Sequence, residues 1–248
     1  MIQSVDRAMR ILGVLQSSRL LALGDIATRL DLAPSTTHGI IKTLQNHGIV
    51  LQDRATGRYR LGPGALKLGN VYLDTLDLRT HAMTWAAELT RSTRHPTRVG
   101  VLLPGEVVIV HHQPRPDGSG HMPEVGIAIP AHACALGKAI LAYSPEGLAA
   151  LPGRLDRMTS NTITDHTRFG EELDRVRAEV LAGEAEEAVI GECGLAAPVF
   201  DSDGSVAGAI GVVVPAGEWP PHDAVPNAVR DAARAVSREL GAPRWPGM

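Results

Sequence analysis

Three arginines and a lysine near the start of the chain have the spacing of a nucleic-acid contact. Arg54, Arg58 and Arg60 flank a short glycine-containing turn, and guanidinium groups carried on such a hairpin donate hydrogen bonds to phosphate oxygens. Upstream lies a polar run whose hydroxyl, imidazole and ammonium groups suit base edges and phosphates. The predicted DNA-contacting residues are Ser35, Thr36, His38, Gly39, Lys42, Arg54, Arg58 and Arg60.

Two helices joined by a tight turn must position the polar run. Apolar residues recur at helical spacing over residues 23–30, and Pro34 then permits a second helix, expected over residues 35–47. One face of this second helix is apolar and packs inward, while the polar run faces outward. Gly39 costs roughly 1 kcal/mol in a helix interior relative to alanine. Close approach of a DNA backbone would explain a glycine on the outer face of this helix.

A hairpin must carry the arginines. Short strands are expected at residues 49–51 and 58–61, with a turn over residues 53–57. An upstream helix with the stripe Ala8, Ile11, Leu12 and Leu15 closes a small core. This order of elements predicts a winged helix-turn-helix that binds duplex DNA. The alternative is a three-helix bundle with an ordinary solvated hairpin.

Charge favours the DNA-binding interpretation. Residues 1–62 hold eight Lys and Arg against four Asp, a balance of +4, and the total of −3 leaves −7 for residues 63–248. The basic charge is therefore concentrated where DNA would lie. The chain has only three Trp, three Tyr and two Phe, too few for the stacking platforms that bind single strands.

The length of 248 residues suits two domains. We expect a winged helix-turn-helix over 1–62, a linker helix over 63–80 that continues or breaks near Arg79, an effector-binding domain over 81–242, and a tail over 243–248. Alternating apolar residues in the linker are typical of a dimer seam, which would match a palindromic site.

The second domain mixes strands and helices in an order that predicts an α+β fold with two helical layers on a mostly antiparallel sheet. A helix cap is expected at Asp165, and the last helix ends at Gly241. Strands are expected at 99–103, 107–110, 125–129, 195–200 and 206–214, and helices at 82–92, 134–143, from 145, from 166 and at 224–240.

No catalytic constellation is recognisable in the second domain. The chain has no nucleophile elbow, no Walker A motif and no dinucleotide-binding glycine pattern. Candidate metal ligands are limited to His111 with His112 and His132 with Cys134, and adjacent strand residues point to opposite faces. We therefore expect no enzyme activity, no metal and no cofactor, and the alternative is an enzyme of unrecognised type with a vestigial DNA-binding head.

Composition suggests the compartment. The two cysteines, Cys134 and Cys193, are too few for a disulfide framework and are typical of a reducing cytosol. No basic-then-apolar leader opens the sequence, and no apolar run is long enough to span a bilayer. A soluble, cytoplasmic protein without a membrane partner is expected.

Five separated blocks resemble the isocitrate-lyase-regulator (IclR) family of transcriptional regulators, in the right order and over nearly the whole chain. Shorter stretches, such as Thr37-His38-Gly39-Ile40 and Arg115-Pro116-Asp117, resemble the actinobacterial glycerol-operon repressors within it. The five blocks are Ser4-Val5-Asp6-Arg7-Ala8, residues 35–62 ending in Gly57-Arg58-Tyr59-Arg60-Leu61-Gly62, His132 with Ala135-Leu136-Gly137-Lys138-Ala139, Asn161-Thr162-Ile163-Thr164-Asp165, and Ala196-Ala197-Pro198-Val199-Phe200.

The resemblance implies a GAF-like effector domain, assembly as a homodimer or a dimer of dimers, and a metabolite that shifts the DNA-binding heads of a repressor of a catabolic operon. Pro34 and Gly39 stand where many members have Lys and Arg, so the operator sequence of this protein cannot be inferred from that of a distant relative.

Members that bind small oxo-acids line the effector site with polar side chains that this chain largely lacks. The pocket is therefore expected to be more apolar and wider, although the glycines could instead serve tight strand packing and Cys134 could be a small core residue. The implied effector-binding residues are Cys134, Ala135, Leu136, Glu184, Gly194, Gly211 and Val213.

The sequence leaves two chemical classes of effector open. The narrower resemblance suggests glycerol 3-phosphate, whose phosphate needs cations or convergent N–H donors. An apolar pocket instead favours a less charged metabolite. The cations that could serve the phosphate are Lys138, His132, Arg98 and Arg115.

Overall fold

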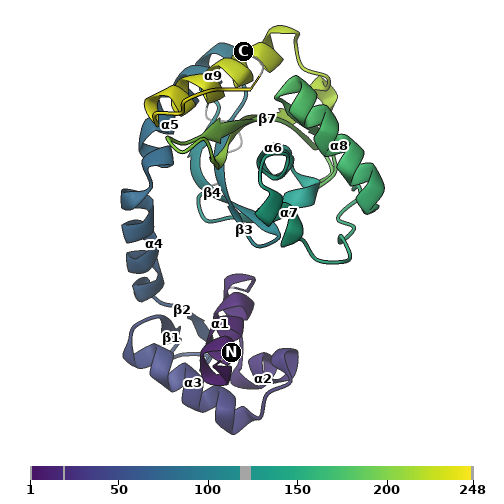
Figure 1. Cartoon of the computed structure of the whole chain (residues 1–248). Helices are drawn as coiled ribbons and strands as arrows, with labels where there is room; N and C mark the ends of the chain where they lie inside the picture. The colour runs from purple at the N-terminus through teal and green to yellow at the C-terminus, as the bar shows by residue number, and fades with distance from the viewer. Residues whose placement is uncertain (1, 19, 118–123, 247–248) are drawn as a thin grey trace. The chain divides into compact units, whose positions relative to one another are not determined.

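The computed structural model describes residues 2–18, 20–117 and 124–246 and divides into two compact units, Met1–Thr75 and Leu76–Met248. The first unit contains the helices α1 (Gln3–Gln16), α2 (Leu23–Leu30), α3 (Pro34–Asn46) and α4 (Pro63–Thr75), with the strands β1 (Val50–Gln52) and β2 (Tyr59–Leu61) (Figure 1).

The first unit is a winged helix-turn-helix, as predicted. Its core is formed by the apolar faces of three helices and by the first residue of each strand. The fully buried residues of this core include Ile11, Ile26, Ile41 and Val50. The turn between α2 and α3 uses Asp31 in the left-handed conformation, at φ 53°. The amide of Leu32 then donates to the carbonyl of Ala27, 2.9 Å away, and closes α2 before Pro34 starts α3 at its first position.

Strands β1 and β2 pair antiparallel, with Val50 opposite Leu61. Gly62, just after the hairpin, lies so close to the preceding turn that a Cβ there would be 2.3 Å from the carbonyl oxygen of Gly48. Only glycine permits this approach. The amide of Gly62 donates to the Ile49 carbonyl at 2.8 Å, which fixes where α4 begins.

The linker is two helices rather than one. α4 ends at Thr75, whose hydroxyl donates to the carbonyls of Val71 and Tyr72, and Leu76 is extended at φ −89° and ψ 99°. α5 (Asp77–Thr93) begins at once, with an acidic residue in its first turn. The break expected near Arg79 thus lies three residues earlier, at Leu76. There the Thr75 hydroxyl competes with backbone amides for the last carbonyls of α4.

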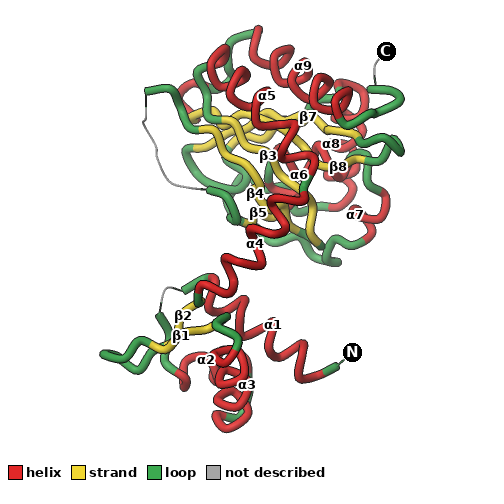
Figure 2. Tube along the Cα trace, turned by 90° about the vertical axis from the view of Figure 1, so that its left-hand side faces the viewer, coloured by secondary structure: helices red, strands yellow, loops and turns green. Residues whose placement is uncertain are grey.

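The second unit is an α+β domain with a six-stranded antiparallel sheet in the order β5-β4-β3-β8-β7-β6 (Figure 2). Its antiparallel pairing and two helical layers confirm the predicted class. The strands are β3 (Thr97–Leu103), β4 (Glu106–Gln113), β5 (Ala128–Pro130), β6 (Ala182–Ala185), β7 (Glu192–Phe200) and β8 (Val206–Pro215).

Helices cover both faces of this sheet. α5 and α9 (Ala224–Glu239) pack together on one face, and α6 (Ala135–Leu141), α7 (Pro145–Ala149) and α8 (His166–Glu179) lie on the other (Figure 1). The larger core joins α6 and α8 to the sheet, with Phe169, Leu173 and Ile140 buried. Asp165 caps α8 through the amide of Arg168 at 2.8 Å, as predicted.

Two strand predictions need correction. The segment expected as a strand at 125–129 forms a turn first, because the Ile127 amide donates to the Glu124 carbonyl and Gly126 adopts φ +90°. Strand β5 therefore begins at Ala128. Strand β6 was not predicted, because Ala182-Gly183-Glu184-Ala185 has low strand propensity and is extended only by pairing with β7.

Candidate nucleic-acid interface and effector site

The outer face of α3 is open. Ser35, His38, Gly39 and Lys42 are exposed and Thr36 is half-buried, whereas Thr37 and Ile41 face the core. No hydrogen bond or ion pair within the described residues occupies the side chains of Ser35, His38 or Lys42. A Cβ at Gly39 would meet nothing within 4 Å, so its glycine is not required by packing within this chain.

The hairpin presents its arginines to solvent from a rigid turn. Arg54, Arg58 and Arg60 are exposed. Asp53 holds the turn by accepting from the Thr56 amide and hydroxyl, at 2.8 and 2.7 Å, and these hydrogen bonds lower the pKa of its carboxyl. In the part of the chain that the structure describes, the three guanidinium groups pair with no carboxylate. α3 and the hairpin thus offer uncommitted donors of the kind that bind phosphates and base edges.

Sequence reasoning missed one residue of this surface, Thr43, which is exposed on α3 next to Lys42 and donates to the Gly39 carbonyl at 3.1 Å. Helical spacing alone would have placed it on the outer face.

The seven expected effector-binding residues come together around one cavity of about 30 Å³ in the second unit. Cys134 caps α6 there, its sulfur accepting from the Gly137 amide at 3.4 Å, and burial raises the pKa of this thiol to about 12. By itself this cavity has room for about two waters, so a ligand of metabolite size would also need the space beside it. A Cβ on Gly211 would lie 2.4 Å from the Leu195 carbonyl, which means that its glycine serves strand packing.

Two larger hollows adjoin this cavity. One has about 640 Å³ and is walled by apolar residues of the 127–130 segment and the 188–189 loop, and the other has about 260 Å³ and is lined by His112, Arg115 and Val213. All three hollows share Arg98. We call them together the effector site, after the expectation from the sequence.

Arg98 extends from β3 and forms ion pairs with two carboxylates. Its Nη2 donates to Glu124 Oε1 at 2.8 Å and to Glu192 Oε2 at 3.3 Å, and its Nε also donates to Glu124. Burial by itself lowers the pKa of the guanidinium, but the two carboxylates outweigh it and hold this pKa above its ordinary value. The site therefore contains a cation held between two hydrogen-bond acceptors, and Arg98 is one of the four cations that the sequence suggested for a phosphate.

Glu184 lies on the wall between the small cavity and the largest hollow. Burial raises the pKa of its carboxyl to about 7, even though Oε2 accepts from the Glu187 amide at 2.9 Å. At neutral pH this carboxyl thus titrates, and a ligand that donates or accepts a hydrogen bond there would shift its protonation.

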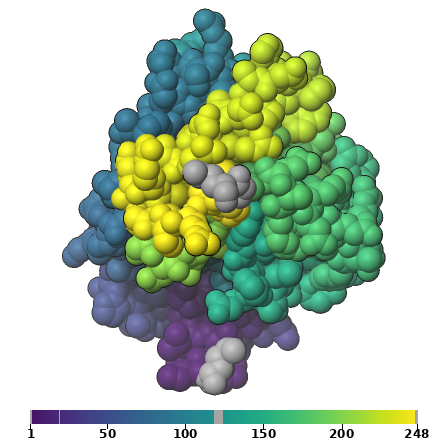
Figure 3. Space-filling model, turned by 45° about the horizontal axis from the view of Figure 1, so that its top comes forward, coloured from purple at the N-terminus to yellow at the C-terminus, as the bar shows by residue number. Residues whose placement is uncertain are grey.

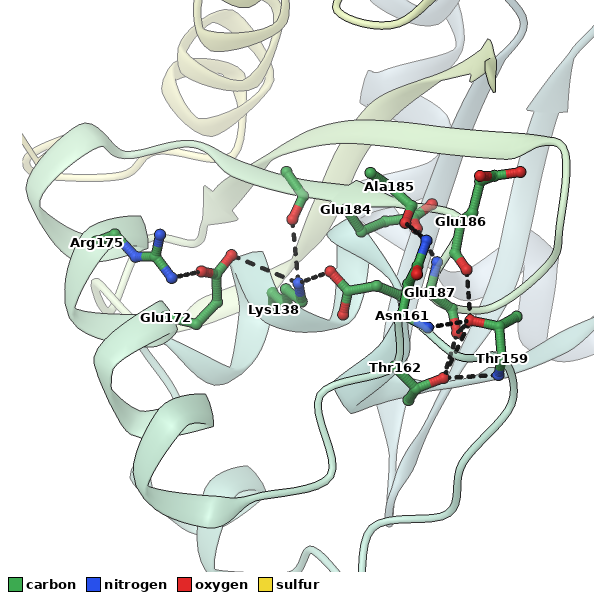
Figure 4. Close-up of polar contacts among 11 residues, drawn as sticks. Lys138, Thr159, Asn161, Thr162, Glu172, Arg175, Glu184, Ala185, Glu186 and Glu187 are labelled. Carbon is green, nitrogen blue, oxygen red and sulfur yellow. Dashed lines mark hydrogen bonds and ion pairs between the residues drawn. The ribbon is translucent and has the colours of Figure 1, made fainter. Parts of the chain in front are cut away.

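Lys138 is not available to a ligand. Its ammonium group is fully buried and donates to Glu187 Oε1 at 2.6 Å, to the Gly183 carbonyl at 3.2 Å and to Glu172 Oε1 at 3.5 Å (Figure 4). The same close-up shows the hydroxyl of Thr162 donating to the Glu187 carbonyl at 2.7 Å. The Lys138 contacts hold Gly183 and Glu187 against α6, and the Thr162 contact holds Glu187 against the 159–162 segment.

The other three candidate cations differ in position. His132 contacts the Asp156 carbonyl at 2.9 Å, beside a different hollow. Arg115 lines the 260 Å³ hollow and approaches Glu218 at 3.5 Å. Arg98 and Arg115 are thus the cations that the fold brings to the effector site.

Among the described residues, no group of three or more His, Cys, Asp or Glu side chains could hold a metal ion. No helix in the described part of the chain has both the length and the apolar character needed to cross a membrane.

Comparison with known proteins matches both units. Residues 4–54 match the family model for the IclR helix-turn-helix domain, and residues 70–238 match the model for the bacterial transcriptional regulator IclR C-terminal domain. The glycerol operon regulatory proteins of Streptomyces griseus and Streptomyces coelicolor are 44% and 42% identical, each alignment covering 98% of both chains.

A solved structure agrees with this. The crystal structure of an IclR transcriptional regulator from Alicyclobacillus acidocaldarius superposes with a TM-score of 0.82 at 25% identity, covering 98% of each chain. Because the two family models follow one another in order and the relatives match along their full length, this chain belongs to the IclR family of DNA-binding transcriptional regulators.

Proposed function

We propose that this protein represses a glycerol-catabolic operon from the cytoplasm and releases its operator when a small phosphorylated metabolite binds the effector site. The observation that carries the proposal is full-length identity of 44% to a protein named for the glycerol operon. The uncommitted cationic surface of α3 and the hairpin supports operator binding.

In the proposed complex, α3 enters the major groove and the hairpin follows the backbone. The side chains of Ser35, Thr36, His38 and Lys42 face base edges and nearby phosphates, and Gly39 lets the backbone approach closely. Arg54, Arg58 and Arg60 bind phosphates from the hairpin, which positions the helix without specifying sequence.

Two copies would bind one palindromic site, and α4 supplies a surface for joining them. The helix buries no residue within its own chain. Leu68, Val71 and Tyr72, which are 66%, 60% and 49% exposed, lie at the three- and four-residue spacing of one helical face. An apolar stripe left open in this way suits a second copy of the same helix across a two-fold axis.

The effector that fits the site is glycerol 3-phosphate. Arg98 and Arg115 flank the 260 Å³ hollow and suit a phosphate, and Glu124 and Glu192 in the same hollow suit hydroxyl donors. The expected effector-binding residues, from Cys134 to Val213, then form the wall behind this subsite. A less charged polyol such as glycerol is the second candidate, because Arg98 already has carboxylate partners.

Fluorescence anisotropy on duplex DNA from upstream of the protein's own operon tests the proposal, with a scrambled duplex as control. Specific binding should weaken with glycerol 3-phosphate and not with glycerol. Arg58→Ala and Lys42→Ala should each lower the log–log salt slope by about 0.9, the value for one lost phosphate contact. Equal affinity for the two duplexes, together with turnover of a metabolite, would instead support the enzyme alternative.

A further inference from the structure

A further hollow, which shares no lining residue with the effector site, lies where α9 meets the C-terminal segment, on the face of the molecule that Figure 3 shows. It has a volume of about 460 Å³, within the range of small-molecule sites. We call it the tail pocket, and its lining residues are Arg234, Ser237, Arg238, Ala242, Pro243, Arg244 and Trp245.

The tail pocket contains three cations and no acid among its described lining residues. Arg234, Arg238 and Arg244 are exposed, and none of them forms an ion pair with a carboxylate in the described ranges 2–18, 20–117 and 124–246. Elsewhere in this unit helical arginines do pair three residues back, as Arg91 does with Glu88 and Arg177 with Asp174.

Helix stability explains only part of this arrangement, since Arg238 lies in the last turn of α9, where a cation interacts favourably with the helix dipole. Arg234 and Arg238 are four residues apart, where like charges destabilise a helix. Arg234 also has Asp231 three residues before it, yet its guanidinium lies over the ring of Trp245, with 5.4 Å between the guanidinium carbon and the ring centroid. Glu239 is engaged by His81 and Trp85 of α5 instead.

The polar side-chain atoms on the floor of the pocket already have hydrogen-bond partners. The Ser237 hydroxyl donates to the Ala233 carbonyl at 2.7 Å and accepts from the Phe200 amide at 3.0 Å. The Trp245 indole is 8% exposed and donates to the Pro198 carbonyl at 3.4 Å. The unsatisfied donors that face the pocket are therefore guanidinium groups, which recognise phosphate and carboxylate oxygens through paired N–H bonds.

We propose that the tail pocket is a second ligand site that binds a small phosphate-bearing metabolite. Arg238 and Arg244 bind the phosphate, and Arg234, whose guanidinium lies over the Trp245 ring, forms the wall against which the rest of the ligand packs. The surrounding domain carries net negative charge over residues 63–248, so three unneutralised cations in one pocket select an anion. The proposal does not depend on which effector binds at Arg98.

Titration of the full-length protein with inorganic phosphate tests the proposal, followed by intrinsic tryptophan fluorescence because Trp245 forms part of the pocket wall. The test variant is Arg238→Gln/Arg244→Gln. The control is Arg154→Gln/Arg168→Gln, which removes two exposed arginines of the same unit that lie outside the pocket. A third variant, Arg98→Gln, reports separately on the effector site.

We expect a saturable fluorescence change whose apparent Kd rises tenfold or more in the Arg238/Arg244 variant and stays within twofold in the control and in Arg98→Gln. An unchanged Kd in the Arg238/Arg244 variant would overturn the proposal. So would an equal rise in the control, which would mean that only net charge matters. A loss of operator affinity with no change in phosphate binding would assign the arginines to DNA and also overturn it.

Discussion

Lys138→Met should destabilise the second unit by about 3–5 kcal/mol, because the substitution leaves buried carboxylates without their cation. The ammonium group has no exposed surface and lies 2.6 Å from Glu187 Oε1. The other oxygen of Glu187 is buried without any hydrogen-bond partner in the described structure. Since each 1 kcal/mol shifts Tm by roughly 2–4 °C in a domain of this size, Tm should fall by roughly 6–20 °C.

Urea unfolding followed by tryptophan emission measures this loss for the second unit alone, because Trp85, Trp219 and Trp245 all lie in it. Arg154→Met is the control, since Arg154 is an exposed cation of the same unit, and it should change the free energy of unfolding by less than about 0.5 kcal/mol. A double variant with Glu187→Leu should lose less than the sum of the two single variants, because neither charge is then buried alone.

The loss should also depend on pH. Burial raises the pKa of Glu187 and Lys138 opposes that rise, so removing the lysine raises the pKa further. A raised native pKa gives stability that is present at low pH and lost as pH rises. The Lys138→Met deficit should therefore be smaller at pH 5 than at pH 8. A deficit below 1 kcal/mol at pH 7.5, or one that is independent of pH, would refute the reasoning.

Three further predictions concern Glu184, Gly39 and α4. Glu184→Gln should match the native protein in urea stability near pH 4.5 and exceed it by about 3 kcal/mol above pH 7. The reason is that the native pKa of about 7 makes the native protein lose stability as pH rises from about 4.5 to 7. Equal pH profiles of the two proteins would contradict this. Gly39→Ala should raise the stability of the first unit by roughly 0.5–1 kcal/mol and weaken operator binding in anisotropy, whereas Gly13→Ala, also in open space on a helix, should give the same stabilisation with unchanged affinity. Val71→Glu/Tyr72→Glu should convert a dimer to monomer in sedimentation velocity, and a persistent dimer would place the seam elsewhere.

Local patterns in the sequence were enough to predict the helices and turns of the first unit. The predicted second helix at 35–47 and the observed α3, Pro34–Asn46, differ by only one residue at each end. The agreement is close because the apolar face of a helix and a proline at its start can both be recognised from the sequence alone. The cap at Asp165 was predictable for the same reason. Strand β6 was not, since its extended form depends on a partner strand.

The effector site was predictable in part. The seven residues that the family resemblance implies lie around one cavity, and their contact with an effector stays a prediction. The size of that cavity was not predictable, because it depends on how closely β7 approaches β8 at Gly211. Nor was the position of Arg98 at the centre, since the residues that pair with it, Glu124 and Glu192, are 26 and 94 positions away in the chain.

The pairing of Arg98 with those two glutamates bears on the effector concentration to which a regulator of this kind would respond. If the proposed effector binds at Arg98, its phosphate meets a guanidinium already paired with two carboxylates, and these carboxylates compete with it. Part of the ligand's interaction energy must go into displacing them. Under this proposal the concentration needed for a response is raised, and the regulator would respond only when the metabolite accumulates. Shortening Glu192 or neutralising it would make the switch more sensitive without adding any contact to the ligand.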